Sequence, residues 1–318
     1  MMVNPIYAFD ILPDGAGRPV SDSDVAPASD AAYRWIHLDL HNDGIRDWLE
    51  KEIDPVVALS LTRQDTRPSI HEHEDGLVIV LRGVNLNPES DPEDMVSIRI
   101  WVEKDRIIST RMRRLMAVVA MRERIEAGKA PASTAEFIAV LAAGLTDRML
   151  PVITELSDRI DALEEESIGR AAGLRSELAD IRRSTIALRR YIAPQRDALA
   201  RLATEPGDWL GRKAQLHLRE TADQVTRLVE ELDSIRDRSG ILNDQLADRR
   251  AEEMNTNMMV LSVVAAIFLP LGFLTGLLGI NVGGMPGADN PIAFYVVCAI
   301  CALIGGGLTW FFRKKGWF

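Results

Sequence analysis

The chain has 318 residues, of which 26% are charged, and a formal net charge of −10 at pH 7. The charge is unevenly distributed, because residues 256–312 contain one charged residue, Asp289, whereas residues 1–255 hold 46 acidic and 34 basic residues. An acidic chain is poorly suited to nucleic acid, whose binding depends on clustered lysine and arginine. The composition therefore argues against a nucleic-acid partner and is compatible with a cation.

The two cysteines, Cys298 and Cys301, both lie in the apolar C-terminal stretch, which argues against a disulfide-stapled secreted protein. The N-terminus lacks a basic region followed by an apolar run and a small-residue cleavage site, so we expect no signal peptide. The first 250 residues are accordingly expected to stay in the cytosol.

Short segments rich in β-branched residues follow one another in the first 130 residues. They predict strands over 34–40, 69–73, 77–84, 96–102 and 106–110. Asp75 and Gly76 are a typical hairpin turn between the second and third of these strands. With helical pieces expected over 43–62 and 112–128, residues 1–130 are interpreted as a small cytosolic α/β domain.

Apolar residues recur at alternating spacings of three and four from Leu218 to Leu246. This heptad-like stripe predicts a helix. Residues 212–269 contain no proline and only one glycine, Gly240. We therefore expect residues 213–279 to form one helix about 100 Å long, at 1.5 Å per residue.

A helix of that length needs a partner, and a second apolar stripe runs from Leu174 to Ile192. Gly169 and Gly173 predict a break before this partner helix, and residues 204–209 (TEPGDW) predict the turn that reverses the chain after it. Residues 131–255 are interpreted as a stalk of long antiparallel helices.

Two uncharged apolar runs follow, at 258–280 and 291–312, and each is long enough to span a bilayer as a helix. Basic residues flank both runs, and the turn between them has none, so the positive-inside rule puts both termini in the cytoplasm. The expected order is a first span at 256–280, an external loop at 281–290, a second span at 291–312 and a basic cytosolic tail at 313–318.

The first span presents mostly small residues on one face. This face consists of Met258, Ser262, Ala265, Leu269, Gly272 and Gly276. Small residues at this spacing can simply bring helices together in lipid. Alternatively, several copies turn this face toward a shared aqueous pore, because one two-helix hairpin cannot enclose a pore by itself.

The same face continues toward the N-terminus through Asn255 to three carboxylates, Asp237, Asp244 and Asp248. Around an axis, these carboxylates would form an acidic vestibule that concentrates cations. The alternative is an ordinary solvated helix face. His71 and His73 share one side of a predicted strand and suggest a cytosolic zinc site, although two histidines are an incomplete ligand set and a solvated hairpin tip is the alternative.

Leu278-Gly279-Ile280-Asn281 ends the first span, and Met285-Pro286 follows it. Gly-x-Asn at this place, with an acidic N-terminal domain, a long stalk helix and a basic tail, resembles the CorA-type family of divalent-cation transporters. Magnesium-transporting members typically have Met between Gly and Asn and a Glu beside Met-Pro. The chain has Ile280 and only Asp289 nearby, which argues against magnesium.

The N-terminal half is more similar to the zinc-transporting ZntB branch of that family. The resemblance is carried by residues 65–68 (DTRP), 81–88 (LRGVNLNP), 92–99 (PEDMVSIR) and 191–199 (YIAPQRDAL).

The resemblance implies a homopentameric funnel in the bacterial inner membrane, with a central pore lined by the first spans and an external ring of Asn281. It implies a zinc transporter with no enzymatic activity and no resident cofactor, and coupling to protons is an expectation inherited from the ZntB branch. The alternatives are a CorA-type magnesium or cobalt channel and a membrane-anchored metal-binding sensor.

Overall fold

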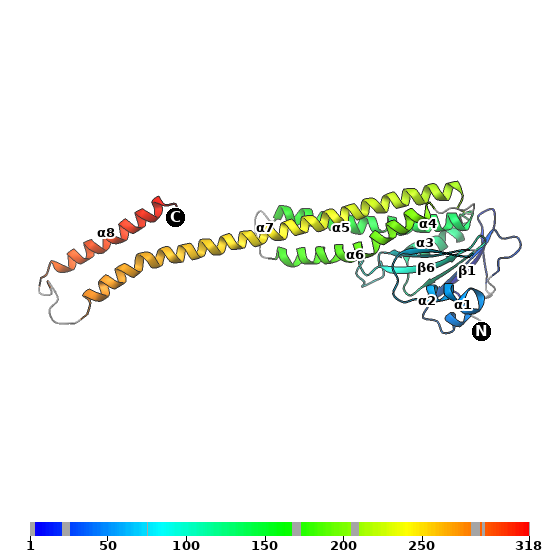
Figure 1. Cartoon of the computed structure of the whole chain (residues 1–318), viewed down its shortest axis with the longest axis horizontal. Helices are drawn as coiled ribbons and strands as arrows, with labels where there is room; N and C mark the ends of the chain where they lie inside the picture. Colours follow the sequence, from blue (N-terminus) through cyan, green and yellow to red (C-terminus); the bar gives the residue numbers. More distant parts are fainter. Residues whose placement is uncertain are drawn as a thin grey trace. The chain divides into compact units, whose positions relative to one another are not determined.

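The computed structural model describes residues 4–20, 26–74, 76–166, 173–204, 210–280, 287 and 290–317 (Figure 1). The chain divides into two compact units, Met1–Leu242 and Asn243–Phe318, here called unit 1 and unit 2.

Unit 1 contains a seven-stranded sheet with the order β2-β1-β3-β7-β6-β5-β4. Neighbouring strands are antiparallel except β3 and β7, which are parallel. The strands are β1 (Tyr7–Ile11), β2 (Gly17–Pro19), β3 (Tyr33–Asp39), β4 (Ser69–His73), β5 (Gly76–Gly83), β6 (Val96–Val102) and β7 (Arg106–Arg111).

All five predicted strands are confirmed, each within one residue of its expected bounds. The β4–β5 hairpin is also confirmed, since His73 pairs with Gly76, although Asp75 lies outside the described residues. Strands β1 and β2 were not predicted. Strand β1 carries the buried Asp10, whose carboxylate accepts a hydrogen bond from Nε of Arg34 at 2.7 Å.

Helices cover both faces of the sheet (Figure 1). On one face, α1 (Ile45–Glu52) and α2 (Pro55–Thr62) bury Trp48 and Leu61 in a core with strand residues such as Ile108. On the other face, α3 (Met116–Glu126) and α4 (Thr134–Asp147) cover the sheet, and the ring of Phe137 lies 5.0 Å from that of Trp35. The expected helical pieces at 43–62 and 112–128 are thus confirmed as three helices.

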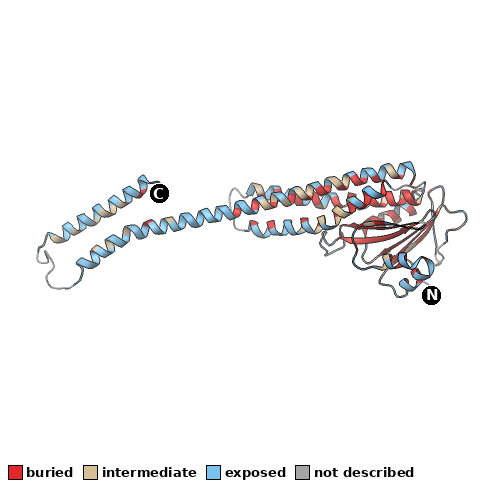
Figure 2. Ribbon diagram, in the orientation of Figure 1, coloured by how far each residue is buried: buried red, intermediate tan, exposed pale blue. Residues whose placement is uncertain are grey.

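Long helices carry the chain onward as α5 (Met149–Glu166), α6 (Leu174–Leu202) and α7 (Arg212–Leu278). The 67 residues of α7 confirm the expected unbroken helix to within one residue at each end. The stripes predicted on α6 and α7 are buried, as the red positions in Figure 2 indicate. The α7 stripe consists of Leu218, Thr221, Val225, Leu228, Leu232, Ile235, Ser239, Leu242 and Leu246.

The break before α6 is built on Gly173, whose φ of 103° lies in the left-handed region that favours glycine. Gly169 and residues 205–209 of the predicted turn lie outside the described residues. The expected stalk at 131–255 begins with α4, which packs on the sheet, and the boundary between the two units falls inside α7.

Among the residues that the structure describes, three helical segments are long and apolar enough to cross a membrane, judged by length and composition: Thr134–Glu166, Arg212–Leu278 and Ala293–Lys314. The last is α8. Half of the most apolar window is buried in Thr134–Glu166, against 6% in Arg212–Leu278 and 0% in Ala293–Lys314. Half of the first segment's most apolar window therefore already packs inside unit 1. The apolar side chains of the other two segments are exposed and need lipid or further protein to cover them.

Candidate ion pathway

One side of α7 is covered by α8 within unit 2. Gly305 and Leu271 mark the approach of the two helices, because a Cβ added to Gly305 would lie 3.6 Å from Cδ1 of Leu271. The least exposed α7 positions from 259 onward are Met259, Val263, Ile267, Leu271 and Leu274. The least exposed α8 positions are Ala293, Val297, Cys301, Ile304, Gly305, Leu308 and Phe312.

The two cysteines differ in their place on α8. Cys301 belongs to the row that is partly covered, whereas Cys298 is exposed. Cys301 thus fits an apolar packing role in the α7–α8 contact.

The small-residue face of α7 lies on the side away from α8. At 100° per residue, its centre is roughly 150° around the helix from the covered row. Asn255 and all six residues of this face are exposed in the chain, and Leu269 is 75% exposed. A Cβ added to Gly272 or Gly276 would meet no atom within 4 Å. Contacts inside the described chain therefore do not explain why these two positions are glycines.

This face offers little with which to hold a bare metal ion. Within the span, Ser262 is the polar residue of this face, and its hydroxyl donates a hydrogen bond to the Met258 carbonyl at 2.8 Å. Its other residues are apolar or glycine. Stripping water from a divalent ion requires oxygen, nitrogen or thiolate ligands in its place. The face is therefore suited to an ion that keeps its hydration water.

At the end of α7, Gly279 donates from its backbone nitrogen to the Gly276 carbonyl at 3.2 Å, and Ile280 is exposed. A Cβ on Gly279 would lie 3.0 Å from the Thr275 carbonyl oxygen, so glycine avoids a tight contact at this helix end. Asn281, the central residue of the predicted mouth, lies outside the described residues, and so do Met285, Pro286 and Asp289. Its role stays a prediction.

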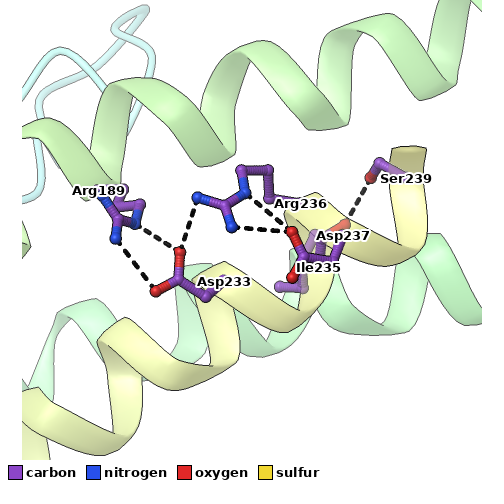
Figure 3. A network of polar contacts seen from close by, with 6 residues as sticks. All are labelled: Arg189, Asp233, Ile235, Arg236, Asp237 and Ser239. Carbon is purple, nitrogen blue, oxygen red and sulfur yellow. Dashed lines mark hydrogen bonds and ion pairs between the residues drawn. The ribbon is translucent and has the colours of Figure 1, made fainter. Parts of the chain in front are cut away.

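The three predicted vestibule carboxylates are exposed, on the side of α7 away from the buried stripe. Asp237 accepts hydrogen bonds from Nε and Nη2 of Arg236 at 3.0 and 2.8 Å (Figure 3). Asp244 and Asp248 form no ion pair with any residue in the described ranges. In the isolated chain, two of the three carboxylates are therefore free to attract a cation, and Asp237 has an arginine beside it.

The same arginine belongs to a network that joins α6 to α7 (Figure 3). Arg189 on α6 donates to both carboxylate oxygens of Asp233 at 2.5 and 3.2 Å, and Nη1 of Arg236 lies 3.1 Å from Asp233. The hydrogen bond from Arg189 lowers the pKa of Asp233. Arg238 adds a second link, because it donates to Glu164 on α5 at 2.7 Å. These pairs fix the register of α7 against α5 and α6.

The two histidines of β4, His71 and His73, lie in different surroundings. His73 is half-buried, and its Nε2 lies 3.2 Å from Oδ1 of Asp54, within ion-pair distance but without hydrogen-bond alignment. Its ring packs edge-on against Trp101. His71 is exposed and does not line the pocket of about 280 Å³ beside His73. Across the described ranges, no group of three or more His, Cys, Asp or Glu side chains is arranged to hold a metal ion.

Sequence reasoning missed a buried centre at Arg82, although it had singled out all four segments that meet there. Nη1 of Arg82 donates to the Met95 carbonyl at 2.7 Å, and Nη2 donates to the Thr66 carbonyl at 2.7 Å. Its guanidinium lies 3.9 Å from the ring centre of Tyr191, and its backbone nitrogen donates to Gln195 Oε1 at 2.7 Å. The signal in the sequence was the ZntB-like set of segments, but their meeting point follows only from the fold.

A family model described as "CorA-like Mg2+ transporter protein" matches residues 30–314 of the chain. The divalent cation transporter CmaX of Pseudomonas aeruginosa is 38% identical over 322 residues, covering 98% of this chain and 96% of that protein. The zinc transport protein ZntB of Pectobacterium carotovorum is 32% identical over 314 residues, covering 98% and 95%. The solved structure of full-length CmaX, 37% identical, superposes with a TM-score of 0.85 and covers 98% of this chain and 97% of that one.

Proposed function

Since the chain belongs to the CorA-like Mg²⁺ transporter family, a family of divalent-cation transporters, we propose that it carries zinc across the bacterial inner membrane as a homopentamer. The first spans, formed by the last third of α7, line a central pore, and α8 forms an outer ring against lipid. Both termini lie in the cytoplasm, in keeping with the basic residues that flank the two spans.

The observation that carries the pore proposal is the uncovered small-residue face of α7. Within the described part of the chain, Gly272 and Gly276 have no neighbour that requires their small size, while α8 lies on the opposite side of the helix. If several copies of the chain surround an axis, the two sides of α7 have different roles. The small-residue face is turned toward water in the pore, and the side next to α8 is turned toward lipid.

The chemistry of this face supports passage of a hydrated ion. Five Asn281 amides at the external mouth would hydrogen-bond the water around a divalent ion without binding it as tightly as five carboxylates. Asp244 and Asp248 would raise the local concentration of cations on the cytosolic side by long-range attraction. Proton coupling has no carrier among the side chains of 258–280, which include no Asp, Glu or His.

Zinc is favoured over magnesium because of the relative named ZntB and because of the residues near the mouth. The sequence has Ile280 between the glycine and the asparagine, and no Glu beside Met285-Pro286. CmaX, the more similar relative in sequence, is named only as a divalent cation transporter. Magnesium or cobalt therefore remains the second candidate cargo.

The proposal is tested by radioactive zinc uptake into proteoliposomes that contain the full chain, with and without a pH gradient. Magnesium and cobalt are measured as competing ions, and empty liposomes are the control. Saturable zinc flux is the expected result, together with particles of five copies in nanodiscs. Monomeric or dimeric particles would reject the pore, and specific metal binding without flux of any of the three ions would favour a membrane-anchored sensor.

A further inference from the structure

A pocket of about 510 Å³ lies at one edge of the sheet in unit 1. Its wall includes His41, which follows β3, and Met112 and Arg113, which follow β7. Because β3 and β7 are parallel, their carboxyl ends meet at this edge. Helix α6 closes the pocket with Arg190 and Tyr191. The volume is in the range of sites that enclose small organic ligands, about 300–1,000 Å³.

The pocket is locally basic in an acidic chain. Three guanidinium groups line it, those of Arg82, Arg113 and Arg190, against the two carboxylates of Glu93 and Asp94. Glu93 already accepts a hydrogen bond from the Ser184 hydroxyl at 2.5 Å.

Two of these arginines have no counter-ion. Arg113 and Arg190 are exposed, and neither forms an ion pair with any residue that the structure describes. Burial lowers the pKa of Arg82, and the positive charge of nearby Arg190 adds to the shift, whereas Tyr191 and Asp65 oppose it. Arg82 and Arg190 therefore repel one another in the isolated chain, and a bound anion would relieve that repulsion.

A fourth guanidinium lies directly behind the pocket wall. Arg99 is fully buried, and its Nη2 lies 3.1 Å from the Gln64 carbonyl and 3.9 Å from the sulfur of Met112, two residues of that wall. Its Nη1 has no hydrogen-bond partner in the described part of the chain. Burial lowers the pKa of Arg99 to about 10, and Arg82 adds to the effect. A buried cation without a carboxylate partner is costly unless an anion is close by.

We propose that this pocket is a binding site for a phosphate monoester of about the size of a mononucleotide. One guanidinium group can donate two parallel hydrogen bonds to two oxygens of a phosphate. Several arginines around one cavity are typical of phosphate recognition. A bare phosphate ion would leave most of the cavity empty, and Met95, Val96 and Met112 offer apolar surface to the remainder of a larger ligand.

The ligand would contact both the sheet edge and α6. Its binding would therefore strengthen the connection between the sheet and α6 that Arg82 already makes. The site is distinct from the ion pathway and does not depend on which cation is carried.

The test uses isothermal titration calorimetry on the full chain in detergent, in buffer freed of divalent metal and at constant ionic strength. The probes are AMP, inorganic phosphate and adenosine, which lacks the phosphate. The test variant combines Arg113→Gln with Arg190→Gln. The matched control combines Arg175→Gln with Arg182→Gln, which removes the same charge from exposed positions of α6 outside the pocket.

We expect AMP to bind the wild type saturably with one site per chain, phosphate to bind more weakly, and adenosine not to bind. The test variant should weaken AMP binding by ~10- to 100-fold, the equivalent of one strong charge-assisted contact or more, and the control should bind as the wild type does. If the test variant unfolds, Arg113→Gln alone, in a loop, should still weaken AMP several-fold.

The proposal is overturned if neither AMP nor phosphate binds the wild type at millimolar concentration. Equal AMP affinity in the test variant and the wild type would overturn it too, as would adenosine binding as tightly as AMP. Because none of these measurements involves transport, a chain without zinc flux could still confirm the site.

Discussion

Gln195 on α6 accepts a hydrogen bond from the backbone nitrogen of Arg82 on β5 at 2.7 Å, between residues 113 positions apart in the chain. Gln195 is fully buried. A single side chain thus connects the sheet to the first long helix that leaves it, at the place where the Arg82 guanidinium is also held.

Replacing Gln195 with alanine should destabilise unit 1 by about 1–3 kcal/mol, because the buried amide of Arg82 loses its acceptor. Urea unfolding of the full chain in detergent, followed by tryptophan fluorescence, measures the change. Gln245→Ala on the exposed side of α7 is the control and should stay within about 0.5 kcal/mol of the wild type. A Gln195→Ala protein as stable as that control would contradict the importance of this hydrogen bond.

Gly272→Leu should reduce zinc flux at least about tenfold, since a large side chain would fill a pore lined by five copies of this face. The fold of the single chain should be unaffected, because a Cβ at this position meets nothing within 4 Å. Gly306→Leu on α8 has equally open surroundings and is the matched control. Similar flux in the two variants would remove this face from the pathway.

Asn281→Ala should nearly abolish zinc flux while the protein still assembles, because the amide is expected to contact water and ion at the external mouth. The control is Asn257→Ala, an exposed asparagine of α7 that lies off the predicted face. Flux and particle size are measured on the same preparations. Wild-type flux in the Asn281 variant would show that the mouth works without this side chain.

Changing Asp244 and Asp248 together to asparagine should reduce zinc flux at low ionic strength far more than at high ionic strength. The attraction of a distant carboxylate is screened over about 8 Å at physiological salt. Glu165→Gln with Glu166→Gln, an equal change of charge on α5, should leave flux unaltered. An equal loss at both salt concentrations would indicate a direct ligand or a structural role and not a screened field.

The stability of unit 1 should fall as the pH drops from about 6.5 toward 3. His37 is fully buried, and burial lowers its pKa from 6.5 to about 3, with a contribution from Arg111. The folded protein keeps the imidazole neutral while the unfolded chain binds a proton, so this group contributes a loss of up to about 1.4 kcal/mol per pH unit in that window. It contributes little slope above about pH 7.5.

Urea unfolding between pH 4.5 and 7.5 measures this slope. His37→Gln, which can keep a hydrogen bond to Ser109, should show a shallower dependence on pH than the wild type. Identical slopes for the two proteins would assign the acid sensitivity to other groups.

Periodicity in the sequence was enough to predict the parts of the fold that repeat locally. The five strands are short segments rich in β-branched residues. The α7 stripe from Leu218 to Leu246 keeps its alternating spacings of three and four for about eight turns, and its residues are buried. Strand β2 has only three residues, one of them Pro19, and carries too short a pattern to be recognised.

The candidate pathway was predicted in part. The small face of α7 follows from helical spacing, but the position of α8 on the opposite side required the packing of Leu271 against Gly305. The Arg82 pocket was beyond sequence reasoning, because its charges come from segments that are far apart in the chain. The overall acidity of the chain also hides a local excess of arginine.

The apolar segment Thr134–Glu166 has a mean hydropathy of 1.5 in its most apolar window, so its length and composition would permit it to cross a membrane. During synthesis it leaves the ribosome before either proposed span, at a stage when the insertion machinery could take it for one. The strands that α4 covers have all been made by then, because they precede it in the chain, whereas α6, against which α5 packs, is made later. N-terminal elements generally fold first, so α4 can bury Phe137 against Trp35 at once. We expect this order of elements to favour burial of the segment in unit 1 over its insertion into the bilayer.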